Sequence, residues 1–492
     1  MEDYEAVIGL EVHAQLLTRS KMFCACSADY AGAEPNTYVC PVCLGMPGVL
    51  PVINHRAVEF TIMTGLALRC EIPTLSKWDR KNYPYPDLPK GYQISQYDLP
   101  LALNGYLQFE MEGQKTRVRI RRVHLEEDTG RLYHVNGATL VDFNRSGVPL
   151  MEVVSEPDIR SPEEARQYLM QLRTILRYLD VSTGDMEAGA FRCDANISVR
   201  RKGETTHGTP VEVKNLNSFR AVKLALEYEM ARQSVLLTRG ESVARETRGW
   251  VADEGRTVSQ RSKELAHDYR YFPEPDLPPL NISPEWVAEV AQWVPELPEA
   301  KRHRFVRDYG LSEYDAAVLV ADRAVAGFFE QAIATASEAE PPVEPKALSN
   351  WITGELFRLM KETAAGIEDA KLSPEALVQL VALVQRDVIS VNVGKDVLEE
   401  MFHSGEPAET IVRSRGFAQI SEADALIEVV LQVLDENPKP VQQYLEGKEQ
   451  VLGFLIGQVM RATGGQANPK VVGQLLQDQL ADREAESMER RA

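Results

Sequence analysis

The stretch Val7-Ile-Gly-Leu-Glu-Val-His-Ala-Gln-Leu16 alternates apolar and polar side chains along most of its length. Because successive side chains of a strand point to opposite faces, this pattern predicts a strand with one face packed on a core. Glu11, His13 and Gln15 share the other face. A carboxylate and an imidazole that point the same way from a rigid strand favour a metal or phosphate site. The alternative is the solvated face of a half-exposed strand.

The same pattern of polar residues on a strand face recurs before residue 220. The segments that carry it are 192–200 with Asp194 and Asn196, 211–214 with Glu212 and Lys214, 141–144 with Asp142 and Asn144, 150–154 with Glu152, and 117–128 with Glu126. An antiparallel sheet with one packed face and one wet face has this alternation. Asp, Asn and Glu are poor strand formers, so their number on one face predicts a cradle of acidic and basic groups.

Composition and charge narrow the class of protein. The chain has 492 residues, 44% of them hydrophobic and 26% charged, which predicts a globular protein of two to four domains. No apolar stretch approaches the length of a membrane span, and the acidic start predicts a cytoplasmic protein rather than a secreted one. The net charge of −19 argues against indiscriminate nucleic-acid binding but leaves open a local patch that recognises a structured RNA.

The character of the chain changes near residue 283. Residues 1–283 read as short strands and turns, with Asn104-Gly105 and Asn136-Gly137 as hairpin turns. Two helices interrupt them, one over 161–179 and one over 218–238. The first has Ser161 as N-cap, Pro162 at the first position and Glu164 closing a capping box. The Pro-rich run 272–279 predicts a domain boundary.

Helical periodicity dominates after this run, with Ser283-Pro284-Glu285 and Ser373-Pro374-Glu375 as helix starts. We therefore predict three domains. They are a cradle domain over 1–283, a helical domain over 284–393 and a small helical tail domain over 394–492.

Four of the six cysteines cluster as Cys24-x-Cys26 and Cys40-Pro-Val-Cys43, with 13 residues between the pairs. Four thiolates at such spacings predict a closed structural Zn²⁺ site, which holds the fold and does no chemistry. The alternative is a set of free buried thiols, and disulfides are the weaker explanation in a cytoplasmic chain. Cys70 and Cys193 are predicted to be core residues because they occupy apolar positions.

Several longer motifs follow the first strand in a fixed order. They are Asp79-Arg-Lys-Asn-Tyr-Pro-Tyr-Pro-Asp87, Tyr92-Gln-Ile-Ser-Gln96, His124-Leu-Glu-Glu-Asp128, Asp142-Phe-Asn-Arg-Ser-Gly-Val-Pro-Leu150, Asp268-Tyr-Arg-Tyr-Phe-Pro-Glu-Pro-Asp276, Gly457-Gln-Val-Met-Arg461 and Ala467-Asn-Pro469. Together with the cysteines they resemble the B-subunit family of the tRNA-dependent aspartyl/glutamyl amidotransferases. The resemblance covers nearly the whole chain.

The resemblance implies an α+β fold and a reaction. The N-terminal antiparallel-sheet cradle would resemble the catalytic fold of glutamine synthetase and the guanidino kinases, and an all-α helical domain and a small α-helical, tRNA-binding tail would follow. The reaction would be ATP-dependent amidation of Glu-tRNA(Gln) or Asp-tRNA(Asn). The implied partners are the amidase (glutaminase) of the complex, which supplies ammonia, a small third protein that completes a heterotrimer, and misacylated tRNA. The misacylating aminoacyl-tRNA synthetase is a further candidate, and no membrane is involved.

This chemistry suits the residues on the predicted strand faces. A carboxylate must be phosphorylated before ammonia can displace an oxygen, and phosphoryl transfer from ATP needs Mg²⁺ and cationic side chains. The resemblance implies that Mg²⁺ is held by Glu11, His13, Glu126 and Glu152. Mg²⁺ prefers oxygen ligands, so His13 is the unusual member of this set.

Further site residues are predicted around these ligands. Arg80, Lys81, Arg145 and Lys214 are candidate ATP phosphate contacts, with surface ion pairs as the alternative. Asp194 and Glu212 complete the predicted catalytic set, and which carboxylate takes a proton from ammonium is left open. Arg461 and Lys470 are the candidate tRNA contacts, because RNA is recognised by shape and a few well-placed cations suffice.

Two other functions compete with this prediction. One is a zinc-stapled tRNA-binding scaffold without chemistry, which leaves the strand-face carboxylates unexplained. The other is a metal-dependent phosphohydrolase or nuclease that uses the same acids. The chain contains neither of the common nucleotide-binding motifs, Gly-x-x-x-x-Gly-Lys-Ser/Thr and Gly-x-Gly-x-x-Gly. It also has no Gly-x-Ser-x-Gly hydrolase motif, so it is not expected to hydrolyse glutamine by itself.

Overall fold

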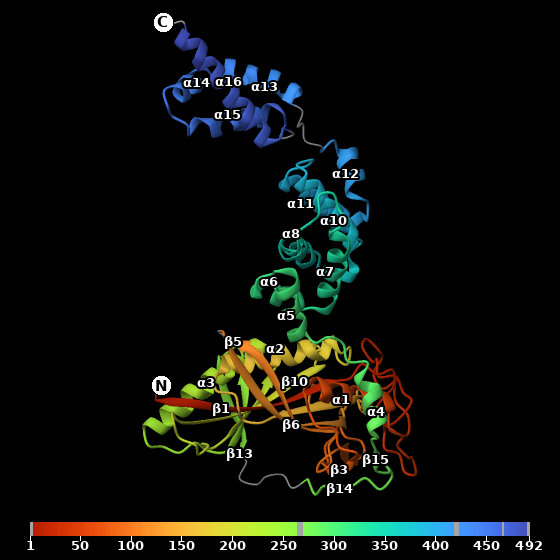
Figure 1. Cartoon of the computed structure of the whole chain (residues 1–492). Helices are drawn as coiled ribbons and strands as arrows, with labels where there is room; N and C mark the ends of the chain where they lie inside the picture. Colours follow the sequence, from red (N-terminus) through yellow and green to blue (C-terminus); the bar gives the residue numbers. More distant parts are fainter. Residues whose placement is uncertain (1–2, 112, 263–268, 418–422, 465–466, 490–492) are drawn as a thin grey trace. The chain divides into compact units, whose positions relative to one another are not determined.

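The computed structural model describes residues 3–111, 113–262, 269–417, 423–464 and 467–489. The chain divides into two compact units, residues 1–300 and 301–492 (Figure 1). Within the described ranges, no helix combines the length and the apolar character that a membrane crossing requires. The first unit is built on β-sheets and the second is helical, which confirms the predicted α+β class.

An eight-stranded sheet forms the centre of the first unit, in the order β13-β12-β11-β10-β1-β9-β6-β5. Its strands are β1 (Tyr4–Gln15), β5 (Ala102–Met111), β6 (Gln114–Glu127), β9 (Pro149–Ser155), β10 (Phe191–Arg201), β11 (Val211–Leu216), β12 (Glu246–Val251) and β13 (Arg256–Ser262). The predicted antiparallel sheet is wrong at one pair, because β11 and β12 are parallel. Parallel neighbours need a crossover, and the helix α3 (Phe219–Thr238) supplies it.

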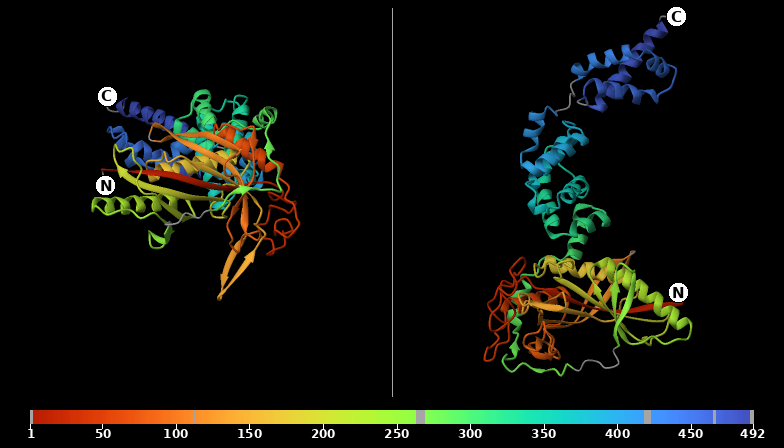
Figure 2. Two further views of the ribbon diagram at one scale, coloured as in Figure 1. Left: turned by 90° about the horizontal axis from the view of Figure 1, so that it is seen from below. Right: turned by 180° about the vertical axis from the view of Figure 1, so that it is seen from behind.

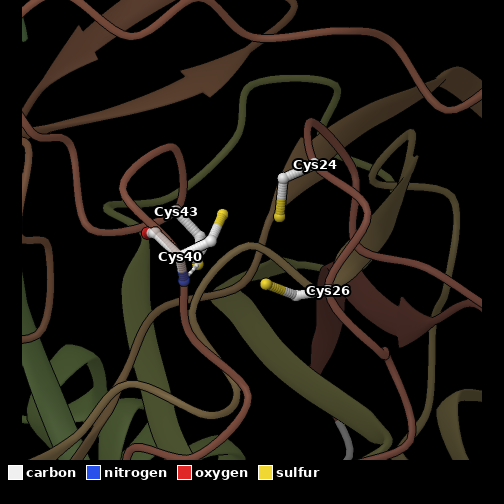
Figure 3. A group of neighbouring side chains, drawn as sticks. All are labelled: Cys24, Cys26, Cys40 and Cys43. Atoms are coloured by element: carbon white, nitrogen blue, oxygen red, sulfur yellow. Dashed lines mark hydrogen bonds between the residues drawn. The ribbon is translucent and has the colours of Figure 1, made fainter.

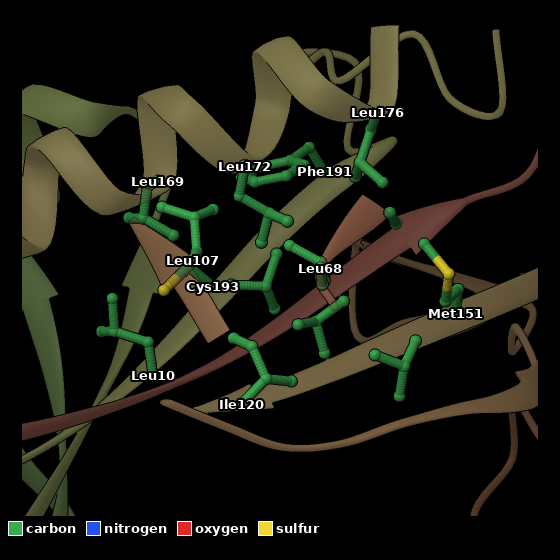
Figure 4. Packing of buried hydrophobic residues seen from close by; sticks show 14 of the residues in the cluster. Leu10, Leu68, Leu107, Ile120, Met151, Leu169, Leu172, Leu176, Phe191 and Cys193 are labelled. Atoms are coloured by element: carbon green, nitrogen blue, oxygen red, sulfur yellow. The ribbon is translucent and has the colours of Figure 1, made fainter. Parts of the chain in front are cut away.

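The apolar face of this sheet carries the core of the first unit. In β1 the apolar residues from Leu10 to Ala14 are buried while Glu11, His13 and Gln15 are partly exposed, which confirms the alternation. The helices α2 (Pro162–Tyr178) and α3 lie on the same side of the sheet (Figures 1 and 2). Figure 4 shows three leucines of α2 beside buried strand residues; the labelled side chains include Leu169, Leu172, Leu176, Leu107, Phe191 and Cys193.

Smaller sheets complete the first unit. A three-stranded sheet has the order β14-β3-β4, with β3 at Asp79–Asn82, β4 at Tyr92–Ser95 and β14 at Phe272–Pro273. Two strand pairs are β2 (Leu75–Ser76) with β15 (Leu280–Asn281) and β7 (Arg131–Val135) with β8 (Ala138–Asp142). The three-stranded sheet reaches the polar edge of β6, since Ser95 Oγ lies 3.4 Å from Glu126 Oε2.

The rest of the chain is helical. The helices are α4 (Pro284–Ala291), α5 (Pro298–Tyr309), α6 (Glu313–Val320), α7 (Arg323–Ala336), α8 (Pro345–Trp351), α9 (Phe357–Thr363), α10 (Pro374–Gln385), α11 (Val391–Ser404), α12 (Ala408–Arg415), α13 (Ala423–Glu436), α14 (Pro438–Leu445), α15 (Val451–Ala462) and α16 (Pro469–Glu489). A π-helical turn at Ile352–Leu356 and a 3₁₀ turn at Ile367–Asp369 separate some of them.

Hydrophobic packing groups these segments differently from the predicted boundaries at 283 and 393. Val290 of α4 is buried in the core of the first unit, so that core continues past residue 283. A second core runs from Phe305 to Val412 and therefore includes α11 and α12. A third core begins at Leu426 and contains side chains up to Leu480.

Helix starts were the most predictable local features. Four helices begin at the serines expected from the sequence. In each case the serine is the N-cap and its side chain accepts a backbone N–H; these residues are Ser161, Ser218, Ser283 and Ser373. One detail differs, because the Glu164 carboxylate accepts from the Arg160 N–H rather than closing the box on Ser161.

The helix α1 (His55–Ala67), which begins after the N-cap Asn54, was not predicted from the sequence. Most of its residues are buried, including Thr61 and Thr64, so it has little amphipathic period to recognise. Its β-branched residues also have low helix propensity. Burial by the surrounding fold therefore determines this helix.

The two predicted Asn-Gly turns had opposite outcomes. Asn136 and Gly137 have positive φ values and join β7 to β8 in a two-residue hairpin, as predicted. Asn104 and Gly105 instead lie inside β5, so that turn prediction is wrong. Glycine is needed at 105 because a Cβ there would lie 2.3 Å from Cys70 Sγ.

Candidate active site and metal centre

The polar face of the central sheet brings together most of the predicted site residues. β1 lies between β9 and β10, so its side chains have neighbours on both sides. Directly opposite residues in antiparallel strands have Cβ atoms about 5 Å apart. The facing pairs are His13 with Arg192 and Glu152, Glu11 with Asp194, His124 with Glu152, and Asn196 with Glu212.

We call His13, Glu126 and Glu152 the His13 cluster. His13 Nε2 lies 3.4 Å from Glu126 Oε1 and 3.5 Å from Glu152 Oε2. One ligand atom from each of the three residues lies within 4.8 Å of the others. Both glutamates are buried, whereas His13 keeps 22% of its side chain exposed. The cluster therefore combines two carboxylates and an imidazole at a partly open position, a donor set that fits a divalent cation.

Charge pairing inside the His13 cluster changes the pKa values of its members more than burial does. Burial lowers the pKa of His13, but the charge of Glu152 and hydrogen bonds to both glutamates raise it to about 10. Burial raises the pKa of Glu126, yet His13 and Lys81 lower it overall. The pKa of Glu152 lies well below its usual value, because His124 and His13 outweigh burial. Both carboxylates are consequently ionised at neutral pH.

His124 also lies next to the His13 cluster and was missed as a site candidate. Its side chain is buried, and its Nε2 lies 3.2 Å from Glu152 Oε2. It shares the face of β6 with Glu126, two residues further on. The alternation used for β1 would have identified His124 if it had been applied to the end of β6.

Lys81 reaches the same cluster from the three-stranded sheet. Burial lowers the pKa of Lys81, but Glu126, Tyr271 and Glu152 raise it, so the ammonium stays charged. Its Nζ also lies 5.1 Å from the ring centre of Tyr269. The structure therefore brings the predicted Lys81 next to the His13 cluster. Asp268, which begins this tyrosine motif, lies outside the described residues.

A second group of charges lies on the neighbouring strands, and we call it the Lys214 cluster: Glu11, Asp194, Glu212 and Lys214. Lys214 Nζ lies 2.5 Å from Asp194 Oδ2 and 3.5 Å from Glu212 Oε1. Hydrogen bonds fix the two glutamates; the donors are Asn196 Nδ2 to Glu11 Oε1 at 3.0 Å and Thr247 Oγ1 to Glu212 Oε2 at 2.6 Å.

Glu11 connects the two clusters electrostatically. Burial raises the pKa of Glu11, and the charges of Glu152 and Asp194 raise it further. Burial lowers the pKa of Lys214, but Asp194 and Glu212 raise it above its usual value. Glu11 does not belong to the group whose ligand atoms lie within 4.8 Å of one another. Glu11 was itself predicted as a metal ligand, and the structure places it next to the other three predicted ligands but outside their group.

A pocket of about 280 Å³ opens beside Glu11 on the same sheet. Arg121, Ser155, Asn196 and His207 contribute polar groups to its lining. The polar face of the sheet therefore offers space for a small substrate group next to the Lys214 cluster.

The arginines proposed as phosphate contacts are engaged elsewhere. Arg80 donates to both carboxylate oxygens of buried Glu274, at 2.6 and 2.7 Å, and its guanidinium lies 4.3 Å from the ring centre of Tyr92. Arg145 donates to the carbonyl oxygens of Thr129 and Gly130 at 2.8 Å each. These contacts favour the alternative of structural pairing for both arginines.

A buried network on the other side of His13 was also missed as a site. Asp128 Oδ2 accepts hydrogen bonds from Gln15 Nε2 and Arg192 Nη2, both at 2.7 Å. Burial raises the pKa of Asp128, but Arg192 and Arg145 lower it overall. Gln15 and Arg192 belong to the polar faces of β1 and β10, so the strand alternation was the signal for them.

Asp142 and Asn144 do not join the polar face of the sheet, in contrast to the sequence pattern. Asp142 Oδ1 accepts the backbone N–H groups of Asn36 and Asn144, and Asn144 Oδ1 accepts that of Tyr38. Their side chains therefore fix the loop that carries the cysteines. Short polar side chains near turns commonly bond to backbone in this way.

The four clustered cysteines converge from two loop segments, and we call them the cysteine cluster (Figure 3). Their sulfur atoms all lie within 4.8 Å of one another, and those of Cys40 and Cys43 are 3.9 Å apart. In a tetrahedral site with Zn–S bonds of about 2.3 Å the sulfurs are about 3.8 Å apart. The spacing therefore fits a four-thiolate metal site, and all four residues are free thiols rather than disulfides.

The thiols of this cluster differ in pKa. A hydrogen bond from Cys24, against the effect of burial, lowers the pKa of Cys43 to about 5. Burial raises the pKa of Cys26 to about 11. Cys193 is buried in the first core as predicted, and Cys70 is partly buried against it.

The two candidate tRNA contacts lie on the last two helices. Arg461 is in the last turn of α15, and Lys470 is in the first turn of α16, where its backbone N–H bonds to Asn468 Oδ1. Both residues are exposed. Their position satisfies the first requirement of a contact with RNA, which is access from solvent.

Comparison with known proteins identifies related chains. Residues 6–288 match the family described as the GatB/GatE catalytic domain, and residues 327–480 match the family described as the GatB domain. The chain is 54% identical over 491 residues to the B subunit of the aspartyl/glutamyl-tRNA(Asn/Gln) amidotransferase of Dehalococcoides mccartyi (strain ATCC BAA-2266 / KCTC 15142 / 195), covering 98% of this chain and 100% of that protein. It is 57% identical over 482 residues to the protein of the same name from Thermomicrobium roseum, covering 97% and 99%.

Proposed function

Because this chain belongs to the family of aspartyl/glutamyl-tRNA(Asn/Gln) amidotransferase B subunits, as its motifs predict, we propose that its sheet face performs the amidation itself. The substrate is Glu-tRNA(Gln), Asp-tRNA(Asn) or both, and ATP donates a phosphoryl group to the side-chain carboxylate. A glutaminase partner supplies ammonia, and a small third protein completes the heterotrimer. The products are Gln-tRNA(Gln) and Asn-tRNA(Asn).

The observation that carries this proposal is the His13 cluster. Its three members converge from β1, β6 and β9, which are adjacent strands of one sheet. The residues fit Mg²⁺, which would be held by Glu126, Glu152 and His13 with Glu11 beside them. When bound, Mg²⁺ neutralises charge on the transferring phosphate. A purely structural sheet has no need of two buried, ionised glutamates around one partly exposed histidine.

The cationic side chains have separate roles in this mechanism. Lys81 holds the transferring phosphoryl group near Glu126 and Glu152, and Lys214 holds phosphate charge on the side of Asp194. The γ-phosphoryl group of ATP moves onto the substrate carboxylate and ADP is released. Ammonia then attacks the carbonyl carbon of this acyl phosphate, inorganic phosphate leaves, and the attacking nitrogen loses a proton to give the amide. Both lysines keep their positive charge because neighbouring carboxylates raise the pKa of each.

Ammonia must reach the reaction as the free base. Ammonium therefore transfers a proton to a nearby carboxylate, and the candidates are Glu11, Asp194 and Glu212. A raised pKa makes a carboxylate a stronger base, and the pKa of Glu11 is raised by burial and by its acidic neighbours. We therefore assign the proton acceptor to Glu11.

Other parts of the chain support the reaction without joining it. The cysteine cluster holds Zn²⁺ with four thiolates, which leaves no open position for chemistry. The helical second unit binds the tRNA, with Arg461 and Lys470 as contacts to phosphates or 2′-hydroxyls. The misacylating synthetase is a further partner in this proposal. We also propose that the fold of the cradle resembles the catalytic fold of glutamine synthetase and the guanidino kinases.

Replacement of Glu126 by Gln tests the proposal against a tRNA-binding scaffold. The assembled enzyme is given misacylated tRNA, ATP, Mg²⁺ and ammonium chloride, and amidated tRNA and tRNA binding are measured together. Glu126→Gln should abolish amidation while tRNA affinity stays within twofold of wild type. Glu227→Gln, on α3 away from the polar face, is the matched control and should leave both unchanged.

Two results would contradict the proposal. Loss of amidation in Glu126→Gln only in proportion to lost tRNA binding would indicate a scaffold. ATP hydrolysis that needs no tRNA and gives no amidated product would indicate a phosphohydrolase instead.

A further inference from the structure

Lys21 is a buried ammonium that none of the roles above explains. Only 1% of the residue is exposed. Its Nζ donates to the Tyr38 carbonyl oxygen at 2.7 Å and to the Phe143 carbonyl oxygen at 3.3 Å. The third neighbour is Cys43 Sγ, at 3.8 Å. Within the described parts of the chain, no ion pair joins Lys21 to a carboxylate.

A buried ammonium without a counter-ion is strongly unfavourable. The two carbonyl oxygens solvate the charge but do not neutralise it. The negative group within reach is the Cys43 sulfur when it is a thiolate. Four thiolates around one divalent cation carry a net charge of −2, so the ammonium would reduce the charge of the metal-loaded cysteine cluster to −1. The charges of Lys21 and of the loaded cluster therefore compensate each other.

Lys21 also links the cysteine loops to the segment of residues 143–148. Its bond to the Phe143 carbonyl is one of several such contacts. The Met22 N–H donates to the Gly147 carbonyl at 2.7 Å, and Asn144 Nδ2 donates to the Glu34 carbonyl at 2.7 Å. A Cβ at Gly147 would lie 3.5 Å from both Cys43 Cβ and Lys21 Cδ, so the backbone passes close to both.

The same segment leads directly into the polar face of the sheet. The Gly147 N–H bonds to the Asp128 carbonyl at 2.9 Å, and the Asp128 N–H bonds to the Val148 carbonyl at 2.8 Å. β9, which carries Glu152, begins at the next residue. The cysteine loops thus brace the chain between Glu126 on β6 and Glu152 on β9, the two glutamates of the His13 cluster.

We propose that Lys21 is the counter-ion of the metal-loaded cysteine cluster and couples its metal occupancy to residues 143–148 beside the His13 cluster. This inference rests on the proposal that the cysteines hold zinc. When the metal is removed, Lys21 loses its counter-charge and the segment loses an anchor. Lys21 is a positioning residue, because it acts through Cys43 and the Phe143 carbonyl and does not touch substrate.

Zinc release tests the counter-ion role directly. The assembled enzyme is prepared as wild type, Lys21→Met and Lys21→Gln, and its zinc content is measured by mass spectrometry. The rate of zinc transfer to a chromogenic chelator is then recorded. Both variants should release zinc about 10- to 100-fold faster than wild type, since changes around metal ligands weaken sites by that factor. Lys77→Met is the control and should match wild type, because it removes a partly buried lysine that is paired with Asp79 and Asp98 away from the cysteines.

Hydrogen exchange tests the coupling and does not depend on activity. Chelation of zinc from the wild-type enzyme should speed amide exchange in residues 143–148. Zinc-loaded Lys21→Met should show faster exchange there without chelation. If Lys21→Met does not fold, Lys21→Gln and the chelated wild type decide the question.

Each remaining outcome overturns a defined part of the proposal. Unchanged zinc release in both Lys21 variants, or faster release in Lys21→Met alone, excludes a counter-ion role, because Gln keeps a donor but carries no charge. Unchanged exchange in 143–148 after chelation excludes the coupling. A wild-type enzyme that neither contains nor takes up zinc removes the zinc proposal itself, together with the inference built on it.

Discussion

The His13 cluster and the Lys214 cluster lie on one face of one sheet, yet they balance their carboxylates in different ways. In the first, a histidine lies between two glutamates, and an imidazole can exchange its proton for a metal ion. In the second, the ammonium of Lys214 already occupies the space between Asp194 and Glu212. Similar strand patterns thus build one site suited to an added cation and one that contains its own.

Removal of one carboxylate from the His13 cluster should have the largest effect. Glu152→Gln keeps the size of the side chain but leaves His13 and His124 without their shared anion. Amidation should fall by about a thousandfold, which corresponds to about 4 kcal/mol of lost transition-state stabilisation. The measurement is kcat with saturating misacylated tRNA. A loss of less than tenfold would show that cation binding does not depend on this cluster.

The ion pairs that pack next to the Lys214 cluster can be tested by measuring the free energy of unfolding. Buried Glu229 of α3 pairs with Arg232 and with Arg248 of β12, next to the strand that carries Glu212 and Lys214. Glu229→Gln should lower the free energy of unfolding of the first unit by about 2 kcal/mol at pH 7, because it removes the buried anion that accepts hydrogen bonds from two half-buried arginines, which then keep only Glu246 nearby. Chemical denaturation followed by fluorescence measures this loss.

The pH dependence of that loss has a definite sign. Burial raises the pKa of Glu229, but hydrogen bonds from Arg232 and Thr257 lower it overall. The stabilisation is therefore complete above the unfolded-state pKa of about 4.3 and disappears as pH falls through the lower folded-state pKa. Wild type and Glu229→Gln should converge in acid, and a difference that grows in acid would contradict the ion-pair explanation.

Lys214 should contribute less than the metal ligands. Lys214→Met removes the cation of its cluster, and amidation should fall by about a hundredfold, the usual cost of losing one charge that stabilises the transition state. Lys223→Met, on α3 with partners Glu163 and Glu227, is the matched control and should change activity by less than twofold. Equal losses in the two lysine variants would remove the distinction between the clusters.

The smallest effects are expected at the tRNA contacts. Arg461→Gln and Lys470→Gln should each weaken tRNA binding by a few-fold and reduce its salt dependence, with kcat unchanged at saturating tRNA. Filter binding at several salt concentrations measures this. A change in kcat with unchanged affinity would place these residues in a step other than RNA binding.

Some elements of the fold could be predicted from the sequence and others could not, and the difference has a physical cause. Strand alternation identified the polar faces of β1, β10 and β11, because one face of each strand is buried. Serine caps identified helix starts, because an N-cap satisfies backbone groups locally. The parallel pairing of β11 with β12 and the buried helix α1 were missed, because tertiary packing determines both.

The site residues also differed in how well the sequence predicted them, because some depend on local spacing and others on tertiary packing. Glu11, His13 and Gln15 could be grouped from local spacing alone. The pairing of Arg80 with Glu274 joins residues far apart in the chain, so no local pattern distinguishes it from a free phosphate contact. No sequence pattern identified Lys21 as a buried residue, because its contacts with Tyr38, Cys43 and Phe143 form only when the chain folds.

Phosphoryl transfer in the absence of ammonia is the most direct test of the central claim. The assembled enzyme is incubated with Mg²⁺, misacylated tRNA and ATP labelled in its γ-phosphate, without glutamine or ammonium. We predict tRNA-dependent ADP release or a labelled aminoacyl phosphate that is absent from Glu126→Gln and Glu152→Gln. If the ATP stays intact while the tRNA is bound, the sheet face is a recognition surface and the phosphorylation takes place elsewhere.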